Sequence, residues 1–151
     1  MATSGYSGTP LAKKIGVKPG HRVHLAHRPC CWQIPDPPDG CMVRDARLGD
    51  GAAGSGGSAS AATAGADITV AFYRAAADLT SESSGLVHSL ADHAMLWIAW
   101  PRRAAGHTSD ITENLLREIF LPLGVVDVKV AALGDDWSGL KFVRRKENRT
   151  T

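Results

Sequence analysis

Two arginines directly follow the most apolar stretch of this chain, and they are the first residues to suggest chemistry. The stretch 94–100 reads Ala-Met-Leu-Trp-Ile-Ala-Trp, and it ends at Pro101, Arg102 and Arg103. A short apolar run with this boundary predicts a central strand that is covered on both faces. Ligands of open α/β sheets bind outside the carboxyl ends of the strands. Arg102 and Arg103 could therefore hold an anion through paired N–H donors, or they could simply be solvated at a strand end.

The segment after these arginines predicts the start of a helix. In the run Ser-Asp-Ile-Thr-Glu over 109–113, Asp110 and Glu113 have the spacing of a capping box with Asp110 as the N-cap. The positive end of the helix dipole would then lie near the arginines and add to an anion site. Asp110 and Thr112 therefore join the candidate binding residues.

Three further candidates lie on the two strands that we predict after this helix. Asp127 and Lys129 are two residues apart, which places them on the same face of a regular strand. They could transfer a proton between them, or they could form an ordinary surface ion pair. Trp137 is expected to plug the end of the sheet, and Ser138 lacks the G-x-S-x-G context of a nucleophile. No catalytic residue is identified, and the candidate ligand-binding residues are Arg102, Arg103, Asp110, Thr112, Asp127, Lys129 and Trp137.

Histidine and cysteine gather after the first predicted strand, but their spacing does not indicate a metal site. Zinc sites space their thiols as C-x₂₋₄-C pairs, whereas Cys30 and Cys31 are adjacent and Cys41 is distant. A catalytic thiol would need a base, for which His24 and His27 are near in sequence, and an electropositive niche. We predict no metal, and the sequence leaves the role of Cys30, Cys31 and Cys41 open.

The turn after the first strand also lacks the signature of a nucleotide cofactor. A Rossmann-type cradle has a G-x-G-x-x-G turn at this point, because glycine lets the backbone approach a pyrophosphate. Here residues 27–32 read His-Arg-Pro-Cys-Cys-Trp. Proline and bulky side chains prevent such an approach, so no dinucleotide or methyl-donor cradle is visible and no cofactor is predicted.

Strand-like and helix-like segments alternate along the chain. Thr9 as N-cap, Pro10 as the first helical residue and Gly16 at the end predict a short helix. A second helix is expected to begin at Thr80 or Ser81, and a third spans about 110–120. The predicted strands are 21–27, 41–45, 67–73, 94–100, 125–133 and 137–145. This alternation indicates an α/β protein whose mainly parallel sheet has helices on both faces and a closing antiparallel hairpin. The pattern resembles a small Rossmann-like, methyltransferase-like three-layer domain, since class I methyltransferases close with a similar antiparallel hairpin.

Length and composition predict a single domain over 1–151. Residues 49–66 are nearly all Gly, Ala and Ser, which predicts a flexible surface insertion, and 144–151 form a basic tail. No apolar run is long enough to span a membrane, no signal-peptide core is visible, and three cysteines make no disulfide framework. We therefore expect a cytoplasmic protein. A net charge of +2 makes nucleic acid an unlikely partner.

Several blocks of the sequence are similar to those of one bacterial protein family. The blocks are Gly-Tyr-Ser-Gly-Thr-Pro-Leu-Ala-Lys-Lys from Gly5, Trp-Ile-Ala-Trp-Pro from Trp97, Gly-Val-Val-Asp-Val-Lys from Gly124, and Trp-Ser-Gly-Leu from Trp137. They resemble the family labelled domain of unknown function 3052. The resemblance implies a small cytoplasmic Rossmann-like protein, and it carries over no catalytic residue. This chain departs from the family at 27–32, where small residues are usual, and at Arg102 and Arg103, where lysines are usual.

These observations favour a non-catalytic module that binds a protein partner or a small anionic ligand. The alternative is an enzyme on a reduced methyltransferase-like scaffold that acts on an anionic substrate through Arg102, Arg103, Asp110 and Lys129. A third hypothesis is nucleic-acid binding through Lys13, Lys14 and the basic tail, which would weaken steeply with salt.

Overall fold

The computed structural model describes residues 10–29, 32–35, 37–46, 63, 65–88, 90–102, 109–134 and 136–144. Six strands form one sheet in the order β2-β1-β3-β4-β6-β5. The strands are β1 (Arg22–Ala26), β2 (Met42–Ala46), β3 (Ile68–Phe72), β4 (Met95–Pro101), β5 (Val125–Ala132) and β6 (Trp137–Arg144). The first four strands run parallel, whereas β6 is antiparallel to both β4 and β5. The predicted α/β class, with its mainly parallel sheet and closing antiparallel hairpin, is confirmed.

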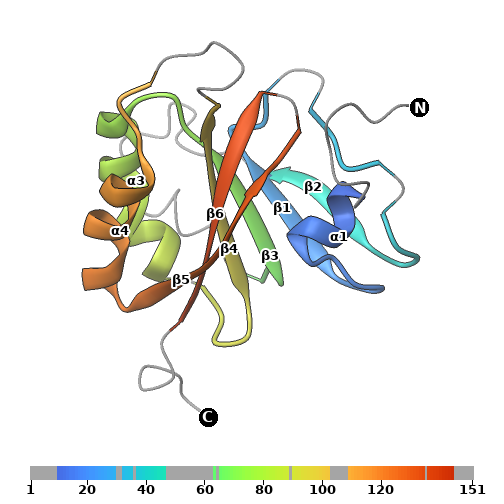
Figure 1. Ribbon diagram of the computed structural model, residues 1–151. Coiled ribbons are helices and arrows are strands. Elements are labelled where there is room, and N and C mark those ends of the chain that lie inside the picture. Colours follow the sequence, from blue (N-terminus) through green and yellow to red (C-terminus); the bar gives the residue numbers. More distant parts are fainter. Residues whose placement is uncertain are drawn as a thin grey trace.

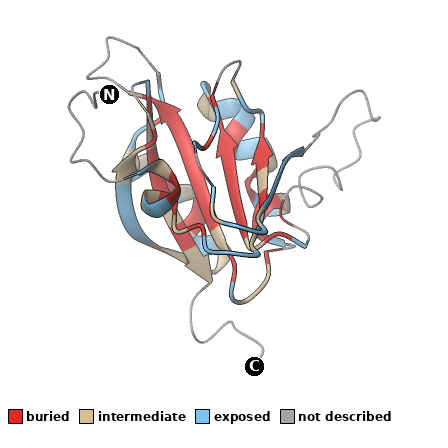
Figure 2. Ribbon diagram, turned by 90° about the vertical axis from the view of Figure 1, so that its right-hand side faces the viewer, coloured by how far each residue is buried: buried red, intermediate tan, exposed pale blue. Residues whose placement is uncertain are grey.

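The sheet is the middle of three layers (Figure 1). Helix α1 (Leu11–Ile15) lies on one face, whereas α3 (Ala76–His88) and α4 (Glu113–Phe120) cover the other, and a short 3-10 turn (Leu121–Leu123) leads from α4 into β5. Every residue of β3 is buried, as are all those of β4 after Met95. Figure 2 shows this buried centre flanked by more exposed strands. Strands buried on both faces are what the near-continuous apolar runs predicted.

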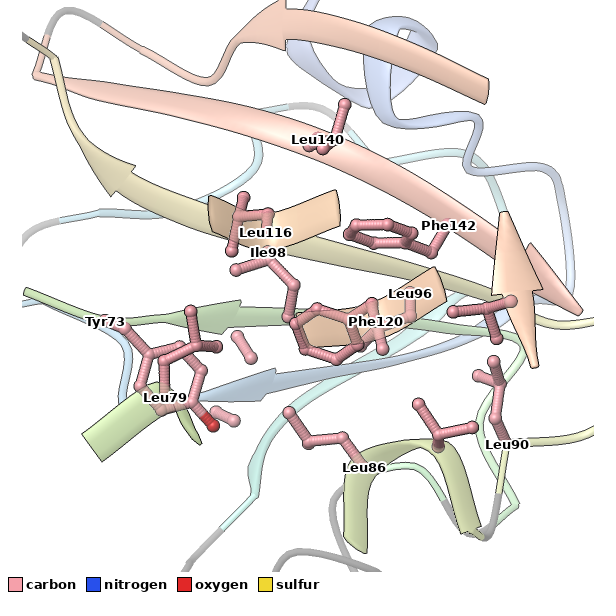
Figure 3. Close-up of a cluster of buried hydrophobic side chains, with 14 of the residues drawn as sticks. Tyr73, Leu79, Leu86, Leu90, Leu96, Ile98, Leu116, Phe120, Leu140 and Phe142 are labelled. Carbon is pink, nitrogen blue, oxygen red and sulfur yellow. The ribbon is translucent and has the colours of Figure 1, made fainter. Parts of the chain in front are cut away.

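The larger core lies between the sheet and the helices α3 and α4 (Figure 3). Leu116 and Phe120 are the fully buried residues of α4, and the Phe120 ring lies 4.9 Å from the ring of Phe142 on β6. Leu79 and Leu86 of α3 complete the contact with β3 and β4. These side chains recur at helical spacing, so each helix buries one stripe against the sheet.

In the part of the chain that the structure describes, the short helix α1 and a loop after β1 supply much of the cover of the opposite face. Trp32 and Ile34, which follow β1, pack with Ile15 of α1 and Trp97 of β4. The Trp97 indole donates a hydrogen bond to the Ile15 carbonyl at 3.0 Å, and the Trp32 indole donates one to the Leu133 carbonyl at 2.8 Å. The large rings thus fill space that a longer helix would occupy, and their buried N–H groups are satisfied.

The first helix confirms its predicted end but not its predicted start. Gly16 closes α1 with φ +94°, in the left-handed region that favours glycine. Pro10 is the N-cap residue with extended ψ, not the first helical residue, so the helix begins one residue later than predicted. Thr9 lies outside the described residues.

Both other helix starts were predicted wrongly, and one side chain explains why. Helix α3 begins at Ala76, not at Thr80 or Ser81, and Asp110 Oδ1 accepts a hydrogen bond from the Ala76 N–H at 2.8 Å. Asp110 therefore stabilises the start of α3 and is not the N-cap of its own helix. That role belongs to Thr112, whose Oγ1 accepts from the Leu115 N–H at 3.1 Å.

A β-bulge divides β5 into two halves that face opposite layers. Asp127 lies opposite Phe142 and Lys129 lies opposite Lys141, so Val128 is the extra residue. Before the bulge, Val125 packs in the core beside α4, whereas Ala131, beyond it, packs in the core beside α1. The prediction that Asp127 and Lys129 share a face is therefore wrong, because a bulge shifts the alternation by one residue.

The end of the predicted flexible insertion is packed against the domain. Thr63 is fully buried, and its Oγ1 donates a hydrogen bond to the Leu86 carbonyl at 2.8 Å. Residues 49–62 and 145–151, together with Cys30, Cys31 and Arg103, lie outside the described residues. Cys41 is a half-buried free thiol that donates to the Lys18 carbonyl at 3.1 Å. No described helix has the length and apolarity that crossing a membrane requires.

Candidate functional site

A cavity opens where the order of strands reverses. The chain passes from β1 to β2 on one side and then to β3 on the other, so the carboxyl ends of β1 and β3 form the switch point at which open α/β sheets bind ligands. The cavity at this point has a volume of about 410 Å³, which is within the range of small-molecule sites. We call it the switch-point cavity, and its lining residues are His27, Pro29, Phe72, Tyr73, Arg74, Asp78, Glu82 and Trp137.

One carboxylate organises the polar side of the switch-point cavity. Glu82 Oε1 accepts a hydrogen bond from the Tyr73 hydroxyl at 2.6 Å and lies 2.9 Å from His27 Nε2. Tyr73 is only 3% exposed, and burial raises the pKa of its hydroxyl, with the neighbouring Glu82 raising it further. The hydroxyl therefore stays protonated and remains a donor to Glu82.

The backbone places His27 in this group at a conformational cost. His27 has φ +57° and is the one non-glycine residue with positive φ in the described part of the chain. That conformation costs about 1–3 kcal/mol for a residue other than glycine. It turns the chain immediately after β1, and it lets the imidazole edge meet the Tyr73 ring, with centroids 5.2 Å apart. Strained backbone residues cluster at active sites and ligand sites, so this strained residue beside a cavity suggests a functional position.

Aromatic rings and an arginine form the other wall. The Arg74 guanidinium lies 5.0 Å from the centre of the Trp137 ring, within cation–π range. The Trp137 ring packs edge-on against Phe72 at 5.1 Å, and Phe72 in turn packs against Trp32 at 4.8 Å. Trp137, one of the predicted site residues, therefore lines the cavity and closes the end of the sheet.

The position at which a Rossmann-type fold binds ribose is filled by the protein itself. In such folds an acidic residue about 20 positions after the glycine-rich turn accepts a hydrogen bond from a ribose hydroxyl. Asp45, near the carboxyl end of β2, is placed to do so, but it pairs with Arg28 at 2.7 and 3.3 Å. Arg28 also donates to the Trp32 carbonyl at 2.6 Å, which fixes its side chain across the ends of β1 and β2.

A second cavity, of about 460 Å³, lies at the carboxyl end of β4 near the start of α4. Thr112 lines it together with Trp100, Pro101 and Ser138, so part of the predicted edge is hollow. Arg102 follows β4, and its N–H donates to the Asp136 carbonyl at 2.8 Å.

The remaining predicted residues do not join this edge. Asp110 accepts a hydrogen bond from the first residue of α3. Asp127 Oδ2 forms an ion pair with Arg117 Nε of α4 at 3.0 Å. The Lys129 ammonium donates a hydrogen bond to the Lys14 carbonyl at 3.2 Å. The candidates that the structure describes, which exclude Arg103, are therefore spread over both faces of the sheet and do not form one cluster.

Sequence reasoning missed His27, Tyr73, Arg74 and Glu82 as a group. The first three directly follow β1 and β3, so the strand-end rule that selected Arg102 would also have selected them. Glu82 was missed because the start of α3 was predicted at Thr80 or Ser81. A helix that begins there gives no reason to expect the side chain of residue 82 near the end of a strand.

Comparison with known proteins identifies the fold. No protein-family model matches the sequence, and no curated protein matches it. Solved structures of S-adenosylmethionine-dependent methyltransferases share its fold. A TehB-like enzyme of Corynebacterium glutamicum matches at 12% identity, with a TM-score of 0.56 over 94% of this chain and 91% of that one. Magnesium protoporphyrin IX methyltransferase of Synechocystis PCC 6803 has 13% identity and a TM-score of 0.57, over 89% of this chain and 74% of that one. A methyltransferase of Aquifex aeolicus has 12% identity and a TM-score of 0.55, over 86% and 85%.

Proposed function

We propose that this protein is a non-catalytic module that binds a small ligand on a methyltransferase-like scaffold. The observation that carries this proposal is the pairing of Arg28 with Asp45 beside a formed switch-point cavity. The pairing supports the absence of a nucleotide at the ends of β1 and β2. The neighbouring cavity still holds polar groups that hydrogen bonds orient, namely the buried Tyr73 hydroxyl, the half-buried Glu82 and the exposed His27. Membership of the family labelled domain of unknown function 3052 remains part of the same proposal.

The charges of the switch-point cavity favour a ligand that carries an ammonium group. Two carboxylates, Asp78 and Glu82, and one guanidinium, Arg74, line this cavity, and the Arg74 cation already lies against Trp137. Asp78 is exposed, and within the described residues no cation lies at ion-pair distance from it. An amine would bind the carboxylates, and a carboxylate on the same ligand would bind Arg74. A small amino acid therefore fits this cavity better than the simple anion that the sequence suggested.

Thermal unfolding in the presence of putrescine, lysine, methionine and inorganic phosphate tests the proposal. A ligand at about 100 times its dissociation constant adds roughly 2.7 kcal/mol to stability. We expect stabilisation by at least one amine or amino acid, its loss in Glu82→Gln and Asp78→Asn, and its retention in Glu118→Gln, a matched change of an exposed glutamate on α4. Stabilisation by phosphate alone would contradict the proposal.

The alternative is an enzyme that uses S-adenosylmethionine, and the fold supports it because the Synechocystis neighbour was solved with that compound bound. The same assay separates the two functions. If S-adenosylmethionine stabilises the protein more than methionine does, the adenosyl group has a site and the enzyme alternative is favoured. If methionine and S-adenosylmethionine act alike, the non-catalytic module is favoured.

A further inference from the structure

Lysines from distant parts of the chain gather on the α1 face of the sheet. Lys18 follows α1, Lys129 lies on β5 and Lys141 lies on β6, and we call these three residues the lysine cluster. Lys129 and Lys141 are register partners across the antiparallel pair of strands. Like charges directly opposite each other destabilise a sheet, so this pairing has no local advantage.

Helix α1 accounts for only part of this arrangement. The Lys14 ammonium donates to the Ala132 carbonyl at 3.4 Å, and the Lys129 ammonium donates to the Lys14 carbonyl at 3.2 Å. These two bonds fasten the helix to β5. They use one of the three N–H donors of Lys129, and they do not involve Lys18 or Lys141.

Lys141 is held as a partly desolvated cation. Its ammonium lies 6.0 Å from the centre of the buried Trp97 ring and beside Gly16, at 3.9 Å from the point where a Cβ on that glycine would lie. Burial lowers the pKa of Lys141, and repulsion from Lys129 and Lys18 lowers it further. Among the described residues, no carboxylate lies within ion-pair distance of any member of the lysine cluster.

We propose that Lys18, Lys129 and Lys141 form a binding site for an oligophosphate group. A compact, multiply charged anion bound by these ammonium groups would offset their mutual repulsion and supply the counter-charge that no described carboxylate provides. An extended nucleic-acid backbone fits less well, because single strands bind through a row of cations with exposed rings for the bases, and the Trp97 ring beneath this cluster is fully buried. The site is separate from the switch-point cavity and does not depend on its function.

Titration calorimetry of the full chain with sodium tripolyphosphate at low salt tests this site. Lys129→Gln and Lys141→Gln should each weaken binding by about tenfold or more, since each removes charge-assisted hydrogen bonds. Lys13→Gln removes the same charge from an exposed position of α1 and should leave binding unchanged. Adenosine triphosphate as a second ligand shows whether the oligophosphate belongs to a nucleotide: tighter binding than tripolyphosphate assigns it to a nucleotide, and equal binding assigns it to the phosphates alone.

A readout on the unaltered protein guards against variants that fail to fold. The pKa of Lys141, followed by NMR, should rise when tripolyphosphate binds, because the anion offsets both the burial and the repulsion that lower it. The proposal is overturned if tripolyphosphate does not bind, if Lys13→Gln weakens binding as much as Lys141→Gln does, or if a single-stranded DNA binds more tightly than tripolyphosphate.

Discussion

Gly139, in the middle of β6, allows the sharpest prediction about this fold. Replacing it by alanine would place a Cβ 2.5 Å from Leu133 Cδ1, 2.8 Å from Leu133 Cγ and 3.0 Å from Trp97 Cε3. Carbon atoms in contact normally lie about 3.5–4.0 Å apart. Leu133 and Trp97 are both fully buried, so neither can move into solvent. The new methyl group therefore overpacks the core beside α1.

The expected loss of stability for Gly139→Ala is about 1–2 kcal/mol. Overpacking of a close-packed core costs roughly 1–3 kcal/mol. The lower conformational entropy of alanine in the unfolded chain returns about 0.4–1 kcal/mol. For a protein of this size, each kcal/mol lowers the melting temperature by roughly 2–4 °C. Urea and thermal unfolding of the wild type and the variant would measure both quantities.

A double-mutant cycle with Leu133→Ala tests the stated cause. Leu133→Ala alone should cost about 2–5 kcal/mol through the cavity that it leaves. In the Gly139→Ala background the same change should cost at least about 1 kcal/mol less, because the added methyl group occupies part of that cavity. Additive effects, or a Gly139→Ala variant as stable as the wild type, would refute the assignment of this glycine to a close contact.

Two further predictions concern a helix cap and a surface carboxylate. Thr112→Ala should lower the free energy of unfolding by about 1 kcal/mol, because the Leu115 N–H loses its acceptor, whereas Thr112→Ser should keep most of the wild-type stability. Urea unfolding compares the two variants, and equal losses of stability would contradict the capping role. Asp67 accepts from the Arg22 N–H at 2.9 Å, and this bond is the main cause that holds the pKa of its carboxyl below the usual 3.8. Its contribution to stability is therefore complete above pH 3.8 and is lost as the pH falls through the lowered pKa. Melting temperatures across acid pH should fall less steeply for Asp67→Asn, and parallel curves would exclude this carboxyl as a source of acid sensitivity.

The sequence pattern alone predicted those elements that are determined by neighbouring residues in the chain. The apolar run 94–100 predicted β4 to within one residue, and Gly16 predicted the end of α1, because burial on both faces and a left-handed turn each leave a direct signature in residue type. The hairpin of β5 and β6 was likewise visible in two strand-like runs around a turn.

Features that depend on a distant side chain could not be predicted in this way. Asp110 looked like the cap of its own helix, whereas it caps α3, which is remote in sequence. Val128 is β-branched and suits a regular strand, so nothing in its type indicates a bulge. That single extra residue places Asp127 and Lys129 on opposite faces of the sheet. A site prediction that assumes regular alternation along a strand fails at such a bulge.

The position of β6 between β4 and β5 also governs the order in which this protein can form during synthesis. β5 leaves the ribosome before β6, yet β6 is its one neighbour in the sheet, and β4 likewise has an open edge until β6 arrives. A nascent chain that stops before residue 137 therefore leaves one edge of β4 and both edges of β5 unpaired, and such edges are templates for aggregation. The sheet is completed only once β6 is free of the ribosome. A chaperone that shields nascent chains should therefore matter more for the yield of this protein than for one whose strands pair in the order in which they are made.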